Sequence, residues 1–86
     1  MYLKDIAKII YKPGTASESL PIKISTIDNP DEIVWEGTAK ELQHMVKLNK
    51  YGRLENVGKW SVCEITRFKN PVTIPIYNRG IHITIY

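Results

Sequence analysis

Three side chains of this sequence could take part in metal binding or nucleophilic chemistry: His44, Cys63 and His82. Zinc sites draw their ligands from such residues, usually in closely spaced pairs such as C-x-x-C or H-x-x-x-H. The three residues lie far apart in the sequence, and none has a second ligand at that spacing. We therefore expect neither a metal site nor a bound cofactor.

Cys63 and His82 could also form a nucleophile and its base if they lay on adjacent strands. A half-buried strand cysteine is more often a small apolar side chain that packs in the core. Glu32 and Glu36 lie four residues apart on a predicted strand and so share a face. We interpret them as solvent-facing charges rather than an acid–base pair. The sequence therefore predicts a protein that is not an enzyme.

A single glycine, Gly37, lies between a predicted strand and a predicted helix, where a phosphate-binding loop would lie. Such loops carry several glycines, as in G-x-x-x-x-G-K-[ST] or G-x-G-x-x-G, because the backbone must approach the phosphates closely. We therefore interpret Gly37 as a hinge between two elements and not as part of a nucleotide site.

The segment that favours binding is residues 47–60, which combine cations with aromatic rings. The candidate binding residues are Lys47, Lys50, Tyr51, Arg53, Lys59 and Trp60. Cations and aromatics dominate the hot spots of protein interfaces. The same mixture holds phosphates and stacks on bases. No RNP motif, GXXG loop or helix-turn-helix accompanies it, so a nucleic-acid-binding module is the alternative to a protein partner.

The net charge of +3 is divided unevenly along the chain. Residues 1–43 hold five Lys/Arg and seven Asp/Glu, whereas residues 44–86 hold seven Lys/Arg and two Asp/Glu. This asymmetry indicates a basic region that could meet a nucleic acid or an acidic protein, although ordinary solvated lysines would give the same pattern. An acidic run in the first half is a smaller candidate for the basic groove of a nuclease: Asp28, Asp31, Glu32 and Glu36.

Length and composition predict one globular domain over residues 1–86, with 43% hydrophobic and 24% charged residues. A chain of this size buries only about 60–65% of its unfolded surface. A homodimer interface would therefore add stability, though nothing in the sequence requires one. Apolar runs are too short to cross a membrane, no signal-peptide pattern is visible, and a single cysteine fits a reducing compartment. We expect a cytoplasmic protein with no membrane contact.

The clearest structural pattern lies in the middle of the chain. Ile33 and Trp35 alternate with polar or smaller residues, which predicts a strand. Thr38 and Glu41 have the spacing of a capping box, and apolar residues at helical spacing follow them. We expect Trp35 and Leu42, from this strand and this helix, to meet in one core.

The remaining segments complete an α+β pattern. Helical spacing predicts a short amphipathic helix from Leu3, Ile6, Ile9 and Ile10. Alternation predicts further strands at residues 21–27, 60–68, 72–76 and 81–86, with a loop at 15–20, a connection at 49–59 and a turn at 77–80. Imperfect alternation in 60–68 indicates a bulge or burial on both faces at one end. The predicted fold is an antiparallel sheet of about four to five strands with two helices on one face.

One short motif and the order of these elements resemble a known class of proteins. The first predicted hairpin ends in Trp35-Glu36-Gly37, within the segment I-V-W-E-G-T-A-K-E-L, and the last strand reads IHITIY. This resembles small accessory proteins of phages and prophages of Gram-positive bacteria, over the first half and the last strand. The resemblance implies a non-catalytic protein in the host cytoplasm. Such a protein would bind a host protein or nucleoprotein complex, including a defence nuclease in the manner of an anti-CRISPR inhibitor.

Overall fold

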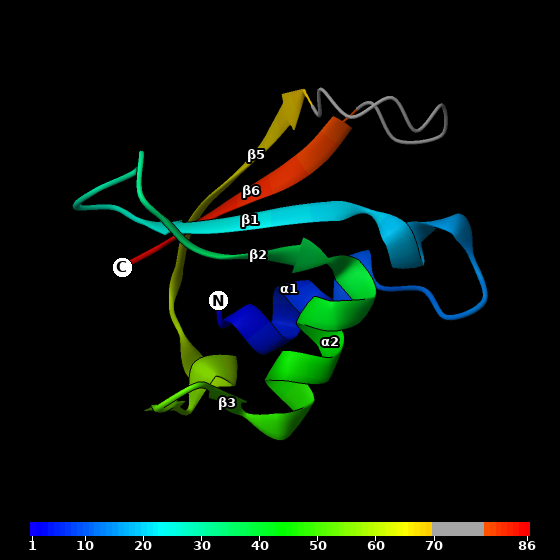
Figure 1. The fold of residues 1–86 in the computed structure, drawn as a ribbon, viewed down its shortest axis with the longest axis horizontal. Helices are drawn as coiled ribbons and strands as arrows, with labels where there is room; N and C mark the ends of the chain where they lie inside the picture. The colour runs from blue at the N-terminus through cyan, green and yellow to red at the C-terminus, as the bar shows by residue number, and fades with distance from the viewer. Residues whose placement is uncertain (70–78) are drawn as a thin grey trace.

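The computed structural model describes residues 1–69 and 79–86, and it confirms the predicted α+β class (Figure 1). Two helices lie on one side of a four-stranded mixed sheet, and a small two-stranded sheet lies beyond them. Within the described part of the chain, no helix has the length and hydropathy needed to cross a membrane.

The described elements follow one another in the predicted order, with four short additional elements. The helices are α1 (Leu3–Ile10) and α2 (Ala39–Leu48), and the main strands are β1 (Pro21–Thr26), β2 (Ile33–Thr38), β5 (Val62–Lys69) and β6 (Arg79–Ile85). The expected loop at 15–20 contains the 3-10 helix η1 (Ala16–Ser19). The expected connection at 49–59 contains β3 (Lys50–Tyr51), β4 (Leu54–Glu55) and the 3-10 helix η2 (Val57–Lys59).

Two predictions concern the segment before the last strand. The strand predicted at 72–76 lies outside the described residues, as does the first half of the turn predicted at 77–80. Arg79 and Gly80, which we expected in that turn, already belong to β6. Gly80 lies under the Phe68 ring, where a Cβ would come within 2.7 Å of the Pro21 carbonyl oxygen. Pro21 of β1 and Phe68 of β5 therefore both lie too close to position 80 for a side chain, which explains the glycine.

The sheet order is β2-β1-β6-β5, and its central pair is parallel. Ile22 lies opposite Ile81, and Ile24 lies opposite Ile83, whereas β1–β2 and β5–β6 pair antiparallel. The sheet is thus mixed rather than wholly antiparallel as predicted. A parallel pair needs a long crossover, and the segment from β2 to β5 supplies it. Alternation shows which face a side chain takes but not the direction of the neighbouring strand.

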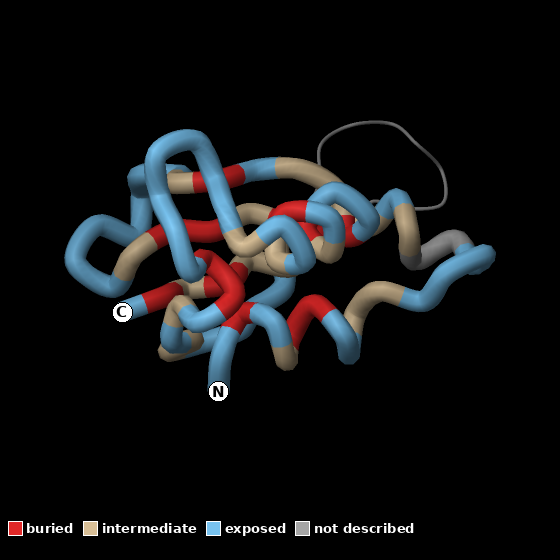
Figure 2. Tube along the Cα trace, turned by 90° about the horizontal axis from the view of Figure 1, so that it is seen from below, coloured by how far each residue is buried: buried red, intermediate tan, exposed pale blue. Residues whose placement is uncertain are grey.

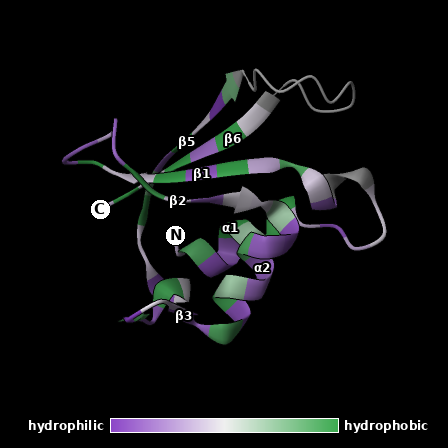
Figure 3. Ribbon diagram, in the orientation of Figure 1, coloured by the Kyte–Doolittle hydropathy of each residue, from purple (hydrophilic) through white to green (hydrophobic). Residues whose placement is uncertain are grey.

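The core lies between the sheet and the two helices, where the buried stretches gather (Figure 2). Its fully buried members include Ile22 and Ile24 from the sheet and Leu3 and Leu42 from the helices. Trp35 belongs to the same cluster, which confirms the predicted meeting of β2 and α2. The inner residues of β1 and β6 form the hydrophobic bands of Figure 3.

Three apolar residues predicted on inward faces are exposed instead: Ile9, Ile33 and Leu48. The β1–β2 register shifts between Ile24 and Ser25, so Ile33 lies opposite Ser25 rather than beside Trp35 on the inner face. Such a bulge turns the side chains beyond it. On the helices, the buried stripe is narrower than the run of apolar residues in the sequence.

The central helix has the predicted capping box. The Thr38 hydroxyl accepts a hydrogen bond from the Glu41 amide at 3.2 Å, and the Glu41 carboxylate accepts one from the Thr38 amide at 3.0 Å. At the other end Asn49 adopts the left-handed conformation, with φ 60°. The start of α2 is therefore held by a side-chain cap, and the helix ends at a residue in the left-handed conformation.

We predict that Thr38→Ala lowers the free energy of unfolding by about 1 kcal/mol, because one amide of the first turn loses its acceptor. Thr38→Ser keeps the oxygen and is the matched control. Denaturant unfolding should rank the three proteins with the serine variant close to wild type. Equal stability of the alanine variant would show that the cap does not hold the helix start.

Candidate functional site

The predicted binding segment, residues 47–60, begins in the last turn of α2, which ends at Leu48 and has Asn49 as its C-cap. The Asn49 side-chain oxygen accepts a hydrogen bond from the Gly58 amide at 3.0 Å, and its amide group donates to the Asn56 side chain at 3.1 Å. Gly52, with φ +59°, lies in the turn between β3 and β4. One asparagine thus ties the β3–β4 hairpin and η2 to the end of the helix.

The six predicted binding residues share this end of the molecule but differ in role. Five of them are exposed: Lys47, Lys50, Tyr51, Arg53 and Lys59. Trp60 is half-buried and packs against the core. Its carbonyl accepts a hydrogen bond from the Leu3 amide at 2.8 Å, and Ser61 bridges to Tyr2. These bonds to the start of α1 explain why β5 begins at Val62, later than predicted.

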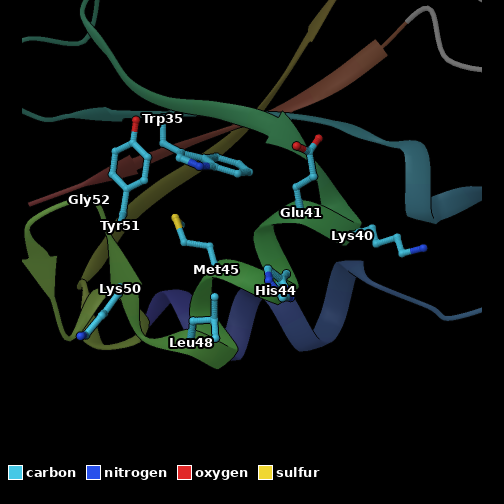
Figure 4. Close-up of a pocket in the computed structure, with 9 residues that line it drawn as sticks. All are labelled: Trp35, Lys40, Glu41, His44, Met45, Leu48, Lys50, Tyr51 and Gly52. Carbon is cyan, nitrogen blue, oxygen red and sulfur yellow. The ribbon is translucent and has the colours of Figure 1, made fainter.

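An open groove of about 480 Å³ lies between α2, β2 and β3 (Figure 4). Its lining comprises Trp35, Lys40, Glu41, His44, Met45, Leu48, Lys50, Tyr51 and Gly52. Trp35 and Met45 form an almost buried floor, 9% and 6% exposed, whereas Leu48 is 59% exposed and Tyr51 is 40% exposed. In Figure 4 the Tyr51 ring lies beside Trp35, and the Met45 side chain points toward the space between them.

Basic side chains border this apolar groove. Lys40 and His44 line it from α2. Lys47, which is not part of the lining, lies on the same side of the helix at three-residue spacing from His44. Lys50 adds a cation at the β3 end of the groove. The lining carboxylate, Glu41, is engaged with the Thr38 amide in the capping box. The groove can therefore accept an apolar group whose neighbours carry negative charge.

Only Lys50 and Tyr51 of the groove lining were predicted as binding residues. The others were assigned to the core strand, to the central helix or, for Gly52, to the connection at 49–59, and the sequence does not show that the β3 turn folds beside the helix and strand. The available signal was Leu48, an apolar residue at the helix end next to Lys47. An apolar residue that lies beyond the part of the helix that the core can bury is a candidate for contact with a partner.

The residues considered for catalysis are not brought together. The His82 Nε2 and the Ser25 hydroxyl share a hydrogen bond of 2.6 Å, and Ser25 is fully buried. Cys63 lies on β5 within the register shift between Val62 and Glu64, which confirms the bulge predicted there. Since His82 lies opposite Thr66 and bonds to Ser25, it does not form a nucleophile–base pair with Cys63.

The two carboxylates weighed as an acid–base pair are also separate. Glu32 lies in the β1–β2 turn and accepts a hydrogen bond from the Asn29 side chain at 2.9 Å, whereas Glu36 lies opposite Lys23 within the sheet. Over residues 1–69 and 79–86, no three His, Cys, Asp or Glu side chains lie close enough together to hold a metal ion.

Comparison of the chain with the models of known protein families, with curated protein sequences and with solved structures gives no match. Support for a function therefore comes from the chain's own residues.

We predict that Cys63 serves local structure rather than reactivity. A side-chain hydrogen bond with Cys63, followed by the charge of its thiolate, raises the pKa of Tyr86 above its ordinary value of 10.0. The neutral phenol is thus favoured in the folded state. This contribution to stability is present below about pH 10 and is lost as the pH rises through the raised folded-state pKa.

In Cys63→Ala, the pKa of Tyr86 should fall toward its ordinary value. Because the chain holds five tyrosines, the measurement is a pH titration of the assigned Tyr86 ring resonances by NMR. The free energy of unfolding near pH 7 should fall by at most about 1 kcal/mol, because the thiol is only partly buried. Loss of partner binding in this variant, with folding intact, would instead assign Cys63 a functional role.

Proposed function

We propose that this chain is a small, non-catalytic accessory protein of the phage type that acts by occupying a host protein or nucleoprotein complex. The observation that carries this proposal is the apolar groove with its basic border, at the end of the molecule where the predicted binding residues gather. The resemblance at Trp35-Glu36-Gly37 favours a host defence nuclease as the target. Action in the host cytoplasm belongs to the same proposal.

The groove suits an apolar side chain of a protein better than a nucleic-acid base. Stacking needs an accessible ring face, but Trp35 is only 9% exposed. Its ring packs so closely over Gly37 that a Cβ there would lie 2.7 Å from the indole. The exposed rings of the lining are Tyr51 and the smaller imidazole of His44, while the largest ring face, that of Trp35, is covered. A hollow with an apolar floor and few polar groups is typical of a protein hot-spot pocket.

Apolar contact and charge would play different parts in such a complex. Burying a leucine-sized side chain contributes about 1.5–3 kcal/mol, whereas an exposed ion pair contributes about 0–1 kcal/mol. Leu48, Tyr51 and the groove floor would therefore provide most of the affinity. The surrounding lysines would attract and orient an acidic partner during its approach.

A nucleic acid is the second candidate partner, and it is favoured by one observation. Residues 47–60 carry four exposed cations and one carboxylate, Glu55, which gives this segment a charge of +3. If four of these cations contacted phosphates of a single strand, the logarithm of the binding constant would fall by about 3 for each tenfold rise in salt.

We predict that the triple variant Lys47→Glu, Lys50→Glu, Arg53→Glu loses its partner in a pull-down from host lysate. The matched control, Asp28→Lys, Asp31→Lys, Glu32→Lys, changes charge by the same amount in the opposite sense and should retain the partner. Nuclease treatment of the lysate should leave the complex intact. Loss of binding in the control alone would place the functional face on the β1–β2 hairpin.

Leu48→Ala separates the two candidate partners. Because Leu48 is 59% exposed, its truncation should leave the fold intact. Capture of a protein partner should fall by tenfold or more as the groove loses an apolar wall, while binding to a labelled oligonucleotide should hardly change. Tight oligonucleotide binding with the salt dependence given above, unaffected by Leu48→Ala, would favour the nucleic-acid alternative over the protein one.

A further inference from the structure

The turn between β1 and β2 is an acidic projection with an apolar base. Asp28, Asp31 and Glu32 are exposed, and the isoleucines on either side, Ile27 and Ile33, are 48% and 39% exposed. We call residues 27–33 the acidic tip. The ribbon of this turn has hydrophilic colours over part of its length in Figure 3, and it projects at the end of the β1–β2 hairpin in Figure 1.

Local hydrogen bonds hold the acidic tip in shape. The Asn29 amide donates to the Thr26 hydroxyl at 3.3 Å, and the Glu32 amide donates to the Asn29 carbonyl at 3.1 Å. The Asn29 side chain also donates to the Glu32 carboxylate at 2.9 Å. A segment that is already ordered loses little conformational entropy when it binds.

The acidic tip has the chemistry that the groove is suited to accept. It pairs exposed isoleucines with three carboxylates, and the groove pairs an apolar floor with Lys40, His44 and Lys50 on its border. The tip cannot enter the groove of its own chain. Trp35 and the tip lie on the same extended strand, whose pairing with β1 keeps them apart.

We propose that the acidic tip of one copy of this protein docks in the groove of a second copy. Isoleucine side chains would cover Leu48 and Tyr51, and the tip carboxylates would face the lysines of the border. The inference rests on the groove being the binding site of the proposed function, with which it shares Lys50 and Tyr51. Self-association would then compete with the partner for the same groove.

Two charge-reversed variants test this contact. Asp28→Lys, Asp31→Lys reverses the tip at two exposed carboxylates, and Lys40→Glu, Lys50→Glu reverses the groove border. A glutamate at position 40 lies in the first turn of α2, where the helix dipole favours it. Sedimentation equilibrium should show concentration-dependent association of the wild type, weakened by added salt. Each variant alone should associate at least about tenfold more weakly, because like charges then face one another.

The decisive sample is an equimolar mixture of the two variants. Both contacts are complementary again in a mixed pair, since lysine tips meet glutamate borders and aspartate tips meet lysine borders. Association should therefore return in the mixture. Circular dichroism and denaturant unfolding of each variant show that both are folded. Leu48→Ala, which leaves all charges in place, should also weaken self-association.

Three results would overturn the inference: a wild-type protein that is monomeric up to about 1 mM, self-association that neither reversal weakens, or a mixture that fails to associate. None of these three results contradicts the proposed function, because capture of a host partner is measured separately. The tip-reversed variant should capture that partner at least as well as wild type. If the wild type does not self-associate and only the groove-reversed variant loses its partner, the proposed function is supported and the self-association is ruled out.

Discussion

The structure depends on the parallel contact between β1 and β6. An isolated two-stranded hairpin is marginally stable in water, and the four-stranded sheet is built from two antiparallel pairs, β1–β2 and β5–β6. The row of Ile22, Ile24 and Ile83 joins them, and all three side chains are fully buried. With the hairpins fused into one sheet, α1 and α2 have a single apolar face to cover, and β2 is left at the edge of the sheet beside α2.

The groove is a consequence of how that edge is covered. The helix of ten residues, capped at Thr38 and Asn49, leaves part of Trp35 uncovered, and its own Met45 faces the same opening. The chain leaves α2 through Asn49, whose side chain fixes the return of η2, and β3 then brings Tyr51 to the other side of the indole. Two nearly buried core residues therefore form the floor of an open hollow, so the groove is made by the same contacts that close the core.

Local patterns predicted the elements, and long-range contacts decided what the sequence could not show. The capping box at Thr38 and Glu41 was recognisable because it depends on residues close together in the chain. The bulge in β5 was recognisable because it interrupts the alternation of residues 60–68. The parallel pairing of β6 and the bulge that turns Ile33 outward depend on partners elsewhere, and alternation alone carries no information about them. For the site, composition predicted Lys50 and Tyr51, whereas Trp35 joins them only because β3 folds back beside β2.

The fold places the acidic tip and the basic border of the groove on different parts of the molecule. The carboxylates of the acidic tip and the indole of the groove belong to one short strand, β2 and its preceding turn, while the lysines come from α2 and β3. Charges that are adjacent in sequence are thus separated along an extended backbone, and charges distant in sequence gather around one hollow. Opposite charges so arranged lie on separate parts of the surface, where water and counterions screen them. In the proposed complexes, an acidic partner would face the lysines of the groove, and the groove of a second copy would face the carboxylates of the tip.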